Sequence, residues 1–390
     1  MKTNEYKGKR VFLLDGYGRQ IPSLLHQLHT LGCITTVMCT SRLNAGYTSR
    51  YPKKKLLVPN LRDDMVAYRA AIMKELDSFP YDVIFPVLER TTDFCTSSEF
   101  HSKYPDLKVI SANREAFLKA YDKQETLRTC QENGVPCPIT KLDTETLDEY
   151  LAKVQFPLAA KPRKGSGGVG FKRIADRAML DAYLADGTIK LEEYVLQELI
   201  PKGGFQYAAF SMFGSDHKPI FTLIAEVPRW FPIDGGPSCY IRTVDRPDIA
   251  QYATTLLEKL NWIGFSHLDF ISDVRDGVPK VMEINGRIPA NVKICEWMGL
   301  QPVKTMLDLV YGKNIAPNTK PIPAGRAMRY FHTDLLWFLK NPERFRAKPS
   351  WFYCLHQKDY IFSWKDPIPF FSYAIEHALN YKKDMKKRQH

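Results

Sequence analysis

Short apolar runs alternate with amphipathic stretches over the first part of the chain. The runs Arg10–Leu14, Ile34–Cys39 and Val83–Val87 have the length and β-branched content of strands. Between the first two, Ile21–Leu31 places its apolar residues at helical spacing. Strands that alternate with helices of this length predict a parallel, doubly wound α/β sheet.

Around residue 120 the pattern changes to short strands separated by loops. A helix over Ala120–Glu132 ends at Asn133-Gly134-Val135-Pro136, with glycine past its end and proline beyond. The strands expected after it are Leu158–Arg163, Val169–Ile174, Val195–Ile200, Ala208–Phe213, Phe221–Val227, His267–Ser272 and Pro279–Asn285. Helices are expected at Ile249–Leu260 and Val303–Tyr311. Short strands of this kind are typical of antiparallel hairpins and indicate a second domain of the α+β class. A proline-rich connector at 317–323 precedes an aromatic tail.

Composition and charge narrow the classes of protein. The 390 residues, 44% of them hydrophobic and 25% charged, are typical of a globular protein with about two or three domains. We see no signal peptide and no apolar run long enough to span a bilayer, and the eight cysteines form no C-x-x-C pair, so we expect a cytoplasmic location. The net charge is +12, but residues 326–390 hold 13 Lys and Arg against 6 Asp and Glu. Because no nucleic-acid-binding motif accompanies this charge, we expect no nucleic-acid partner.

A glycine-rich segment lies between two expected strands. Lys161 precedes four glycines within six residues, at positions 165, 167, 168 and 170. A phosphate-binding loop of the Walker or Rossmann type would lead into a helix, whereas this segment leads from strand to strand. In such a hairpin the backbone N–H groups of the glycines can donate to a polyphosphate, because no side chains are in the way, while Lys161 neutralises the phosphate charge. The alternative is a flexible surface hairpin.

An acidic pair marks a second hairpin. Glu283 and Asn285 are two residues apart on one strand, so they share a face and offer the hard oxygen ligands that Mg²⁺ prefers. Asp269, on the partner strand, adds a second carboxylate if it lies opposite Glu283. We therefore predict an odd-numbered loop with Gly277 in the left-handed region, because a two-residue Asp-Gly loop would put the carboxylates on opposite faces. The alternative is a pair of ordinary solvent-facing carboxylates.

A third segment, Leu196–Gly204, is an apolar strand that runs into a glycine-rich turn. It could present backbone groups to an adenine edge, but taken alone it is better interpreted as an edge strand. Together and in order, the three segments resemble the ATP-grasp superfamily, most closely its carbamoyl-phosphate-synthetase-like branch. The resemblance covers about residues 10–312, is strongest over 119–295, and includes Lys123 before the Gly-Val-Pro turn and the block Asp269…Glu283-Ile-Asn285-Gly-Arg287.

The resemblance implies a division of the chain and a set of roles. The implied parts are a Rossmann-like pre-ATP-grasp domain (1–118), a small lid with the glycine hairpin (119–195), a large subdomain with the metal site (196–325) and an extension of unknown role (326–390). The implied ATP-binding residues are Lys123, Lys161, Ser166, Gly167, Gly168, Gln197, Glu198, Ile200 and Gln206. The last stands where relatives often place an acidic residue for the ribose. The implied ligands of Mg²⁺, or of Mn²⁺, are Asp269, Glu283 and Asn285, and the implied catalytic residues are Lys161 and Arg287, the latter bracing a phosphorylated intermediate.

The implied activity is an ADP-forming ligation in which a carboxylate becomes an acyl phosphate and an amine, such as that of an amino acid, then attacks it. The alternative is a nucleotide-binding regulatory module without ligase activity. Carbamoyl phosphate synthesis is disfavoured because the chain has one such unit and no glutaminase domain. The expected partners are therefore a small carboxylate and a small amine, and a homodimer is compatible with the sequence.

Three residues are candidates for substrate contact. Arg242 ends the glycine-broken loop that begins at Trp230, and its guanidinium can grip a carboxylate with two hydrogen bonds. Glu89 follows a strand end, where ligands bind open α/β sheets, and can hold an acceptor amine. His267 is a candidate for lining the site. Ordinary surface roles for Arg242 and Glu89, and a hydrogen-bonded strand position for His267, remain the alternatives.

The tail combines apolar and basic residues. Phe371, Ile375 and Leu379 follow a four-residue spacing, and the basic segment 382–388 comes next. A helix of this kind can lie on an anionic membrane surface. The other interpretation is a helix docked on the protein's own domain with a solvated basic end.

Overall fold

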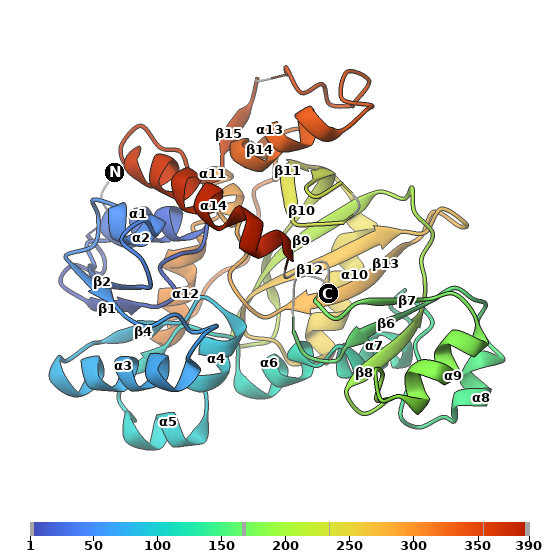
Figure 1. Cartoon of the computed structure of the whole chain (residues 1–390). Coiled ribbons are helices and arrows are strands. Elements are labelled where there is room, and N and C mark those ends of the chain that lie inside the picture. The colour runs from blue at the N-terminus through green and yellow to red at the C-terminus, as the bar shows by residue number, and fades with distance from the viewer. Residues whose placement is uncertain (1–3, 166–168, 234, 354, 387–390) are drawn as a thin grey trace.

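Five parallel strands form the first sheet of the computed structural model, in the order β3-β2-β1-β4-β5 (Figure 1). The structure describes residues 4–165, 169–233, 235–353 and 355–386. The strands are β1 (Arg10–Leu13), β2 (Ile34–Cys39), β3 (Lys54–Leu57), β4 (Val83–Phe85) and β5 (Lys108–Val109). The helices between and after them are α1 (Ile21–Thr30), α2 (Ala45–Thr48), α3 (Met65–Ser78), α4 (Glu89–Cys95) and α5 (Ser98–Lys103). The expected parallel, doubly wound sheet is confirmed.

Alternation along β1 explains why helices cover both faces of this sheet. Val11 and Leu13 pack with Leu24 of α1, whereas Phe12 on the other face packs with Tyr68 of α3. Successive side chains of a strand point to opposite faces, so an apolar run without polar interruption requires cover on both.

A three-stranded antiparallel sheet forms the lid, in the order β7-β6-β8 (green in Figure 1). Its elements are β6 (Leu158–Pro162), β7 (Lys172–Ile174), β8 (Tyr194–Glu198), α8 (Leu147–Leu151) and α9 (Arg177–Ala185). The single helix expected over 120–132 is two helices, α6 (Arg114–Tyr121) and α7 (Lys123–Glu132). The break falls at Asp122, whose carboxylate accepts from the N–H of Gln124 and caps α7.

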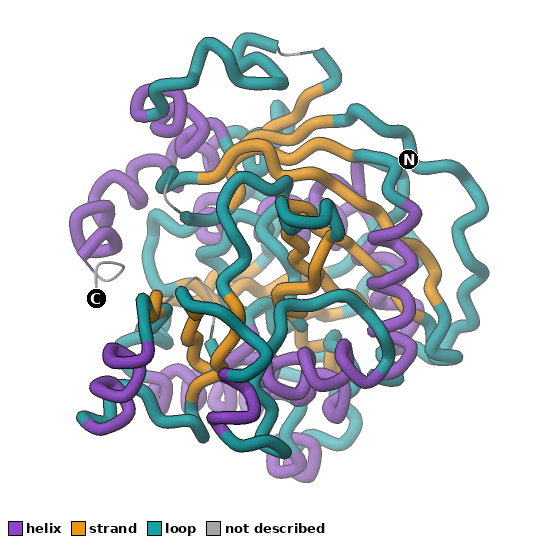
Figure 2. Tube along the Cα trace, turned by 90° about the vertical axis from the view of Figure 1, so that its right-hand side faces the viewer, coloured by secondary structure: helices purple, strands orange, loops and turns teal. Residues whose placement is uncertain are grey.

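The largest sheet has seven strands, in the order β13-β12-β9-β10-β11-β14-β15, and forms one curved layer (Figure 2). Its strands are β9 (Gln206–Phe213), β10 (Pro219–Trp230), β11 (Ser238–Thr243), β12 (Gly264–Ser272), β13 (Pro279–Asn285), β14 (Ala327–Arg329) and β15 (Gln357–Asp359). The accompanying helices are α10 (Pro247–Lys259), α11 (Lys293–Trp297) and α12 (Pro302–Val310). Strand β11 lies where the sequence led us to expect a loop.

The register between β12 and β13 places the two carboxylates opposite each other. Asp269 pairs with Glu283, as predicted. The predicted odd loop is wrong, because Ser272 pairs with Pro279 and an even number of residues, 273–278, lies between them. A one-residue bulge between Asp269 and Phe270 supplies the shift instead, and Gly277 does adopt a left-handed φ of +75°.

The two faces of the large sheet have different cover. Tyr207 and Phe270 face α10, in a core with Ala253 and Leu257. The opposite face begins with Asp269, whose neighbours across the sheet are Ala208, Ala225 and Thr243 in turn. That face therefore carries the acidic pair.

Residues 326–390 continue this sheet and return to the first domain. Strand β14 pairs with β11, and α13 (Phe331–Lys340) is held by a buried ion pair of 2.6 Å between Arg229 Nε and Asp334 Oδ1. Helix α14 (Ile368–Lys386) lies against α2 (Figure 1), where Ser372 contacts Thr48 at 2.7 Å. The expectation of a helix docked on the protein's own domain is thus confirmed for one face of α14. Within the part of the chain that the structure describes, no helix is both long and apolar enough to cross a bilayer.

Candidate active site

The acidic pair forms the floor of the candidate site. Asp269 and Glu283 face each other on β12 and β13, and Asn285 Nδ2 donates to Asp269 Oδ2 at 2.8 Å. Burial raises the pKa of Asp269, against the opposing effects of the Asn285 hydrogen bond and the charge of Arg287. The Asp269 side chain is still 40% exposed. A carboxylate whose pKa is raised lacks sufficient positive charge around it, so the cluster is suited to a cation.

Arg287 and His267 flank this cluster. Arg287 Nη2 donates to Asn285 Oδ1 at 3.1 Å. Burial lowers the pKa of His267 to about 3, so its ring is neutral at physiological pH. Its Nδ1 lies 3.2 Å from the amide nitrogen of Asn285, whereas its buried Nε2 has no hydrogen-bond partner among the described residues. His267 is thus a neutral group at the edge of the site rather than a cation.

Lys123 joins the acidic strand to the glycine hairpin. It is the first residue of α7, and its Nζ lies 3.7 Å from Glu283 Oε2 and donates to the carbonyl oxygen of Gly165 at 2.6 Å. The side chain is only 13% exposed, so this ammonium is held between the two hairpins. The glycine segment and the acidic pair, 118 residues apart at positions 165 and 283, therefore meet at one cation.

Lys161 lies on β6 close to the same charges. Burial lowers its pKa to about 8, while Glu283 acts to raise it and Lys123 to lower it. Two ion-pair hydrogen bonds fix the lid strand to α7: Arg163 Nε donates to Asp122 Oδ1 at 3.0 Å and Nη2 to Oδ2 at 2.6 Å. The predicted phosphate-binding residues Ser166, Gly167 and Gly168 lie outside the described residues.

The segment after β8 connects the lid to the large sheet. Gln197 is buried and its amide donates to Thr140 at 3.1 Å, so its side chain supports the lid. The N–H of Glu198 donates to Ile139, whereas neither backbone group of Ile200 has a hydrogen-bond partner in the described chain. Gln206, the first residue of β9, pairs with Ile271. Ile200 thus offers the free backbone groups that an adenine edge requires.

An ion network that the sequence analysis missed fixes this connection. The Glu198 carboxylate accepts from Arg275 at 2.6 Å and from Lys280 at 3.1 Å. Lys280 also lies 2.8 Å from the fully buried Asp273, which pairs with Arg275. The signal was present in the sequence as charges of both signs within 273–280, next to the Asp-Gly turn.

Glu89 is brought to the other side of the site by the first domain. It begins α4, and the preceding loop is fixed by the buried Asp15, which accepts from the N–H groups of Val87 and Leu88 at 3.0 Å each. Burial raises the pKa of Glu89, and the charges of Arg287, Glu283 and Lys123 act on the same carboxyl. Because those three residues define the site, Glu89 lies at its border.

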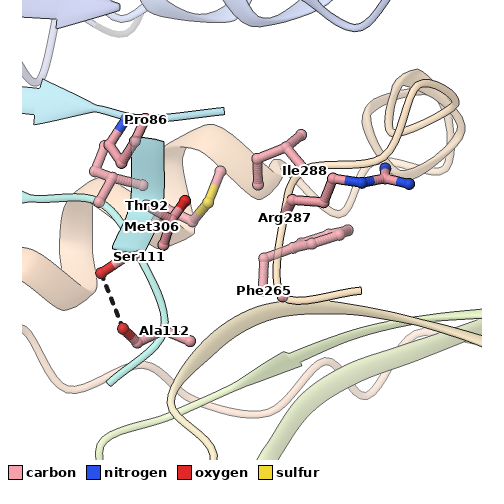
Figure 3. A pocket seen from close by; sticks show the side chains of 10 residues that line it. Pro86, Thr92, Ser111, Ala112, Phe265, Arg287, Ile288 and Met306 are labelled. Carbon is pink, nitrogen blue, oxygen red and sulfur yellow. Dashed lines mark hydrogen bonds between the residues drawn. The ribbon is translucent and has the colours of Figure 1, made fainter. Parts of the chain in front are cut away.

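A small, partly open cavity lies between the ends of β4 and β5 and the segment after β13. Figure 3 shows Phe265, Ile288 and Met306 as its apolar lining, while the guanidinium of Arg287 extends away from that lining. Thr92 and Ser111 add hydroxyl groups. The arrangement places one cationic residue at the border of a mostly apolar pocket.

The structure does not bring Arg242 to this site. Arg242 pairs across the sheet with Glu226, which pairs with Tyr207 on the face covered by α10. Its Nε donates to Glu226 Oε1 at 2.8 Å. The acidic pair lies on the opposite face, so this placement gives no support to the predicted carboxylate grip.

The site fits Mg²⁺ only with help from a bound anion. Within the described residues, no group of three or more His, Cys, Asp and Glu side chains is arranged to hold a metal ion. The chain supplies two carboxylates and one amide, and the amide oxygen of Asn285 becomes available if Arg287 turns to an anionic substrate. Mg²⁺ usually completes such a shell with phosphate oxygens and water.

Comparisons with known proteins agree with this geometry. Residues 120–291 match the family model of the ATP-grasp domain. The chain is 25% identical over 120 residues to the D-alanine–D-alanine ligase of Sulfurimonas denitrificans, covering 31% of this chain and 34% of that one. It is 22% identical over 254 residues to the corresponding ligase of Bacillus anthracis, covering 55% and 79%. The chain thus spans about a third of the first relative and most of the second.

Two solved structures share the fold. The L-amino acid ligase from Bacillus licheniformis superimposes with a TM-score of 0.60 at 17% identity, covering 82% of this chain and 79% of that one. The biotin carboxylase domain dimer of Hydrogenobacter thermophilus 2-oxoglutarate carboxylase, in complex with MgADP, ADP and bicarbonate, gives 0.65 at 14% identity, covering 82% and 73%. With the match over 120–291, these findings show that the chain carries an ATP-grasp domain.

Proposed function

We propose that the protein is an ATP- and Mg²⁺-dependent ligase that activates a carboxylate as an acyl phosphate and couples it to an amine, releasing ADP and phosphate. The observation that carries the proposal is the position of Lys123, whose ammonium lies 3.7 Å from Glu283 on β13 and donates to the Gly165 carbonyl of the lid. An anion of high charge that enters between the hairpins would replace both contacts with phosphate oxygens.

The residues divide the work of binding the nucleotide. Lys123 and Lys161 neutralise the phosphates, and the backbone of Glu198 and Ile200 faces the adenine. Asp269, Glu283 and Asn285 hold Mg²⁺ (Mn²⁺ fits the same ligands), which supplies charge neutralisation for the phosphoryl group in transfer. Catalysis of this kind rests on positioning and electrostatics, so it needs no nucleophilic side chain.

The substrates lie on the side of the first domain. Arg287 holds the acid, because it is the cation next to the acidic pair that does not belong to the lid or to α7. Glu89 holds the ammonium of an amine or amino acid on the side of the site where Thr92 and Arg287 line the small cavity. The relatives that are named as D-alanine and L-amino acid ligases support an amino acid as one substrate.

The setting of the protein is part of the same proposal. The cysteines that the structure describes are all unpaired, which favours a reducing cytoplasm. The biotin carboxylase domain of Hydrogenobacter thermophilus 2-oxoglutarate carboxylase was solved as a dimer, which supports a homodimer of the present protein.

The test is ADP formation with a panel of carboxylic acids and amino acids. We expect release of ADP that requires an acid and an amine together, and loss of this activity by at least about 100-fold in Lys161→Ala, which removes a phosphate-binding charge. The matched control is Lys190→Ala, an exposed lid lysine that pairs with Glu193. Binding of ATP without ADP release for any acid–amine pair would favour the regulatory module instead.

A further inference from the structure

The last sixth of the chain exposes far more apolar surface than the rest. Of the 22 large apolar side chains exposed among the described residues, 11 belong to residues 326–390. That is three times the share expected from length, and the same residues carry a net charge of +7 from 13 Lys and Arg and 6 Asp and Glu. The extension is therefore both apolar and basic on its outside.

Helix α14 concentrates this surface on one face. Ile368, Phe371, Ile375 and Leu379, here called the apolar stripe, are each between 52% and 72% exposed. The opposite face is occupied by the protein itself, since Ser372 contacts Thr48 and Glu376 accepts from Asn44 at 2.7 Å. Docking on α2 thus fixes the helix with its stripe turned outward.

We propose that the apolar stripe of α14 and the basic residues that follow it dock the protein on an anionic membrane surface. The chain continues from Leu379 to five basic residues and one acidic residue within 382–388. An amphipathic helix with a basic end lies in the interface of a bilayer, with its apolar side chains among the acyl chains and its charges at anionic headgroups. Trp364, 88% exposed just before the helix, is a residue type enriched at that interface.

Charge favours a membrane over a second copy of the chain. A two-fold contact through the stripe would bring a second basic segment to the interface and would supply no anionic partner for either one. An anionic lipid surface complements both the stripe and the charge. The site of ATP binding is not involved, because none of these residues belongs to it.

The experiment is co-sedimentation of the full-length protein with vesicles of mixed phosphatidylglycerol and phosphatidylcholine, and with vesicles of phosphatidylcholine alone. We expect binding to the anionic vesicles that weakens with salt. The double variant Phe371→Ser/Ile375→Ser should partition at least about tenfold less, because two large apolar side chains are lost from the contact. Lys382→Gln/Lys383→Gln should weaken binding about fivefold per charge. The matched control, Leu57→Ser/Val66→Ser, changes exposed apolar residues of the first domain and should bind as the unaltered protein does.

Both pairs of apolar positions are exposed, so the variants should fold, which circular dichroism checks. Equal binding by the stripe variant and the control, or no binding of the unaltered protein to anionic vesicles at low salt, overturns the proposal. A dimer in solution that the stripe variant alone dissociates would assign the surface to a second copy and overturn it as well.

Discussion

Two clusters of acidic residues lie along the β12–β13 hairpin, one of them shared with Glu198 of β8, and they differ in how their charges are balanced. Near the turn, Asp273 and Glu198 are surrounded by Arg275 and Lys280, and the resulting network ties the hairpin to the lid connection. At the other end, Asp269 has an amide as its hydrogen-bond partner, at 2.8 Å.

The pKa shifts of the two clusters have opposite signs. Hydrogen bonds from Arg275 lower the pKa of Asp273 against the effect of burial. Burial raises the pKa of Asp269, because its polar neighbours do not compensate for lost water. The first cluster is complete within the chain and stabilises structure, whereas the second is electrostatically incomplete and is the one that we assign to metal and nucleotide.

The largest effect on turnover is expected from Glu283→Gln, which tests whether the second cluster binds the metal ion. Removing a charged metal ligand should lower turnover by about 1000-fold, since a metal ion supplies several kcal/mol of transition-state stabilisation. The free energy of unfolding should change by less than about 1 kcal/mol, because relief of the repulsion between Asp269 and Glu283 offsets the loss of the ion pair between Glu283 and Lys123. ADP formation and urea unfolding measure the two effects, with the exposed lid residue changed in Glu193→Gln as control. Turnover within tenfold of normal would remove Glu283 from the metal site.

Asp273→Asn should give the reverse pattern. Asp273 is fully buried between Arg275 and Lys280, so loss of its charge leaves Lys280 poorly compensated and should cost about 2–3 kcal/mol of folding free energy. Turnover by the folded protein should change much less, because the residue lies away from Glu283. The control is Asp276→Asn in the same loop, where the carboxylate is exposed. A stable but inactive Asp273→Asn protein would show that the network acts in the reaction itself.

The contribution of Asp273 to stability should also depend on pH. The pKa of Asp273 is lowered on folding, so its contribution to stability is present above the ordinary aspartate pKa of about 3.9 and is lost as pH falls toward the folded value. The free energy of unfolding should therefore decrease below about pH 4 and decrease less steeply in Asp273→Asn. Urea unfolding across this pH range measures both slopes, and parallel slopes would mean that Asp273 is not the group that titrates.

Much of this arrangement could be predicted from local sequence. Because Glu283 and Asn285 are two residues apart on a strand, the sequence predicted that they share a face. The alternation of strands with helices predicted the parallel sheet. The pairing of Asp269 with Glu283 was predicted for the wrong reason, because a bulge depends on packing across the sheet and leaves no signature in a single sequence. The Glu198 network was missed because its members are up to 82 residues apart, as in the pair Glu198 and Lys280.

The position of Arg242 was not predicted because strand β11 was expected to be a loop. The glycines at 235 and 236 suggested a loop from Trp230 to Arg242, and a loop residue can point in any direction. The structure instead has β11 from Ser238, so the direction of each side chain is set by its pairing with β10. That pairing directs Arg242 to the face opposite the acidic pair.

The smallest effect is therefore expected from Arg242→Ala. Its ion pair with Glu226 is partly exposed, so its loss should cost less than about 1 kcal/mol of folding free energy. Turnover and KM for the acid should change less than about threefold, because no substrate contact is lost, whereas Arg287→Ala should raise KM for the acid and lower kcat together. Steady-state kinetics on the two variants measures the contrast. A rise in KM of tenfold or more in Arg242→Ala would mean that the guanidinium reaches the acid around the sheet edge, and the division of the large sheet into a helix-covered face and a reactive face would then fail at β11.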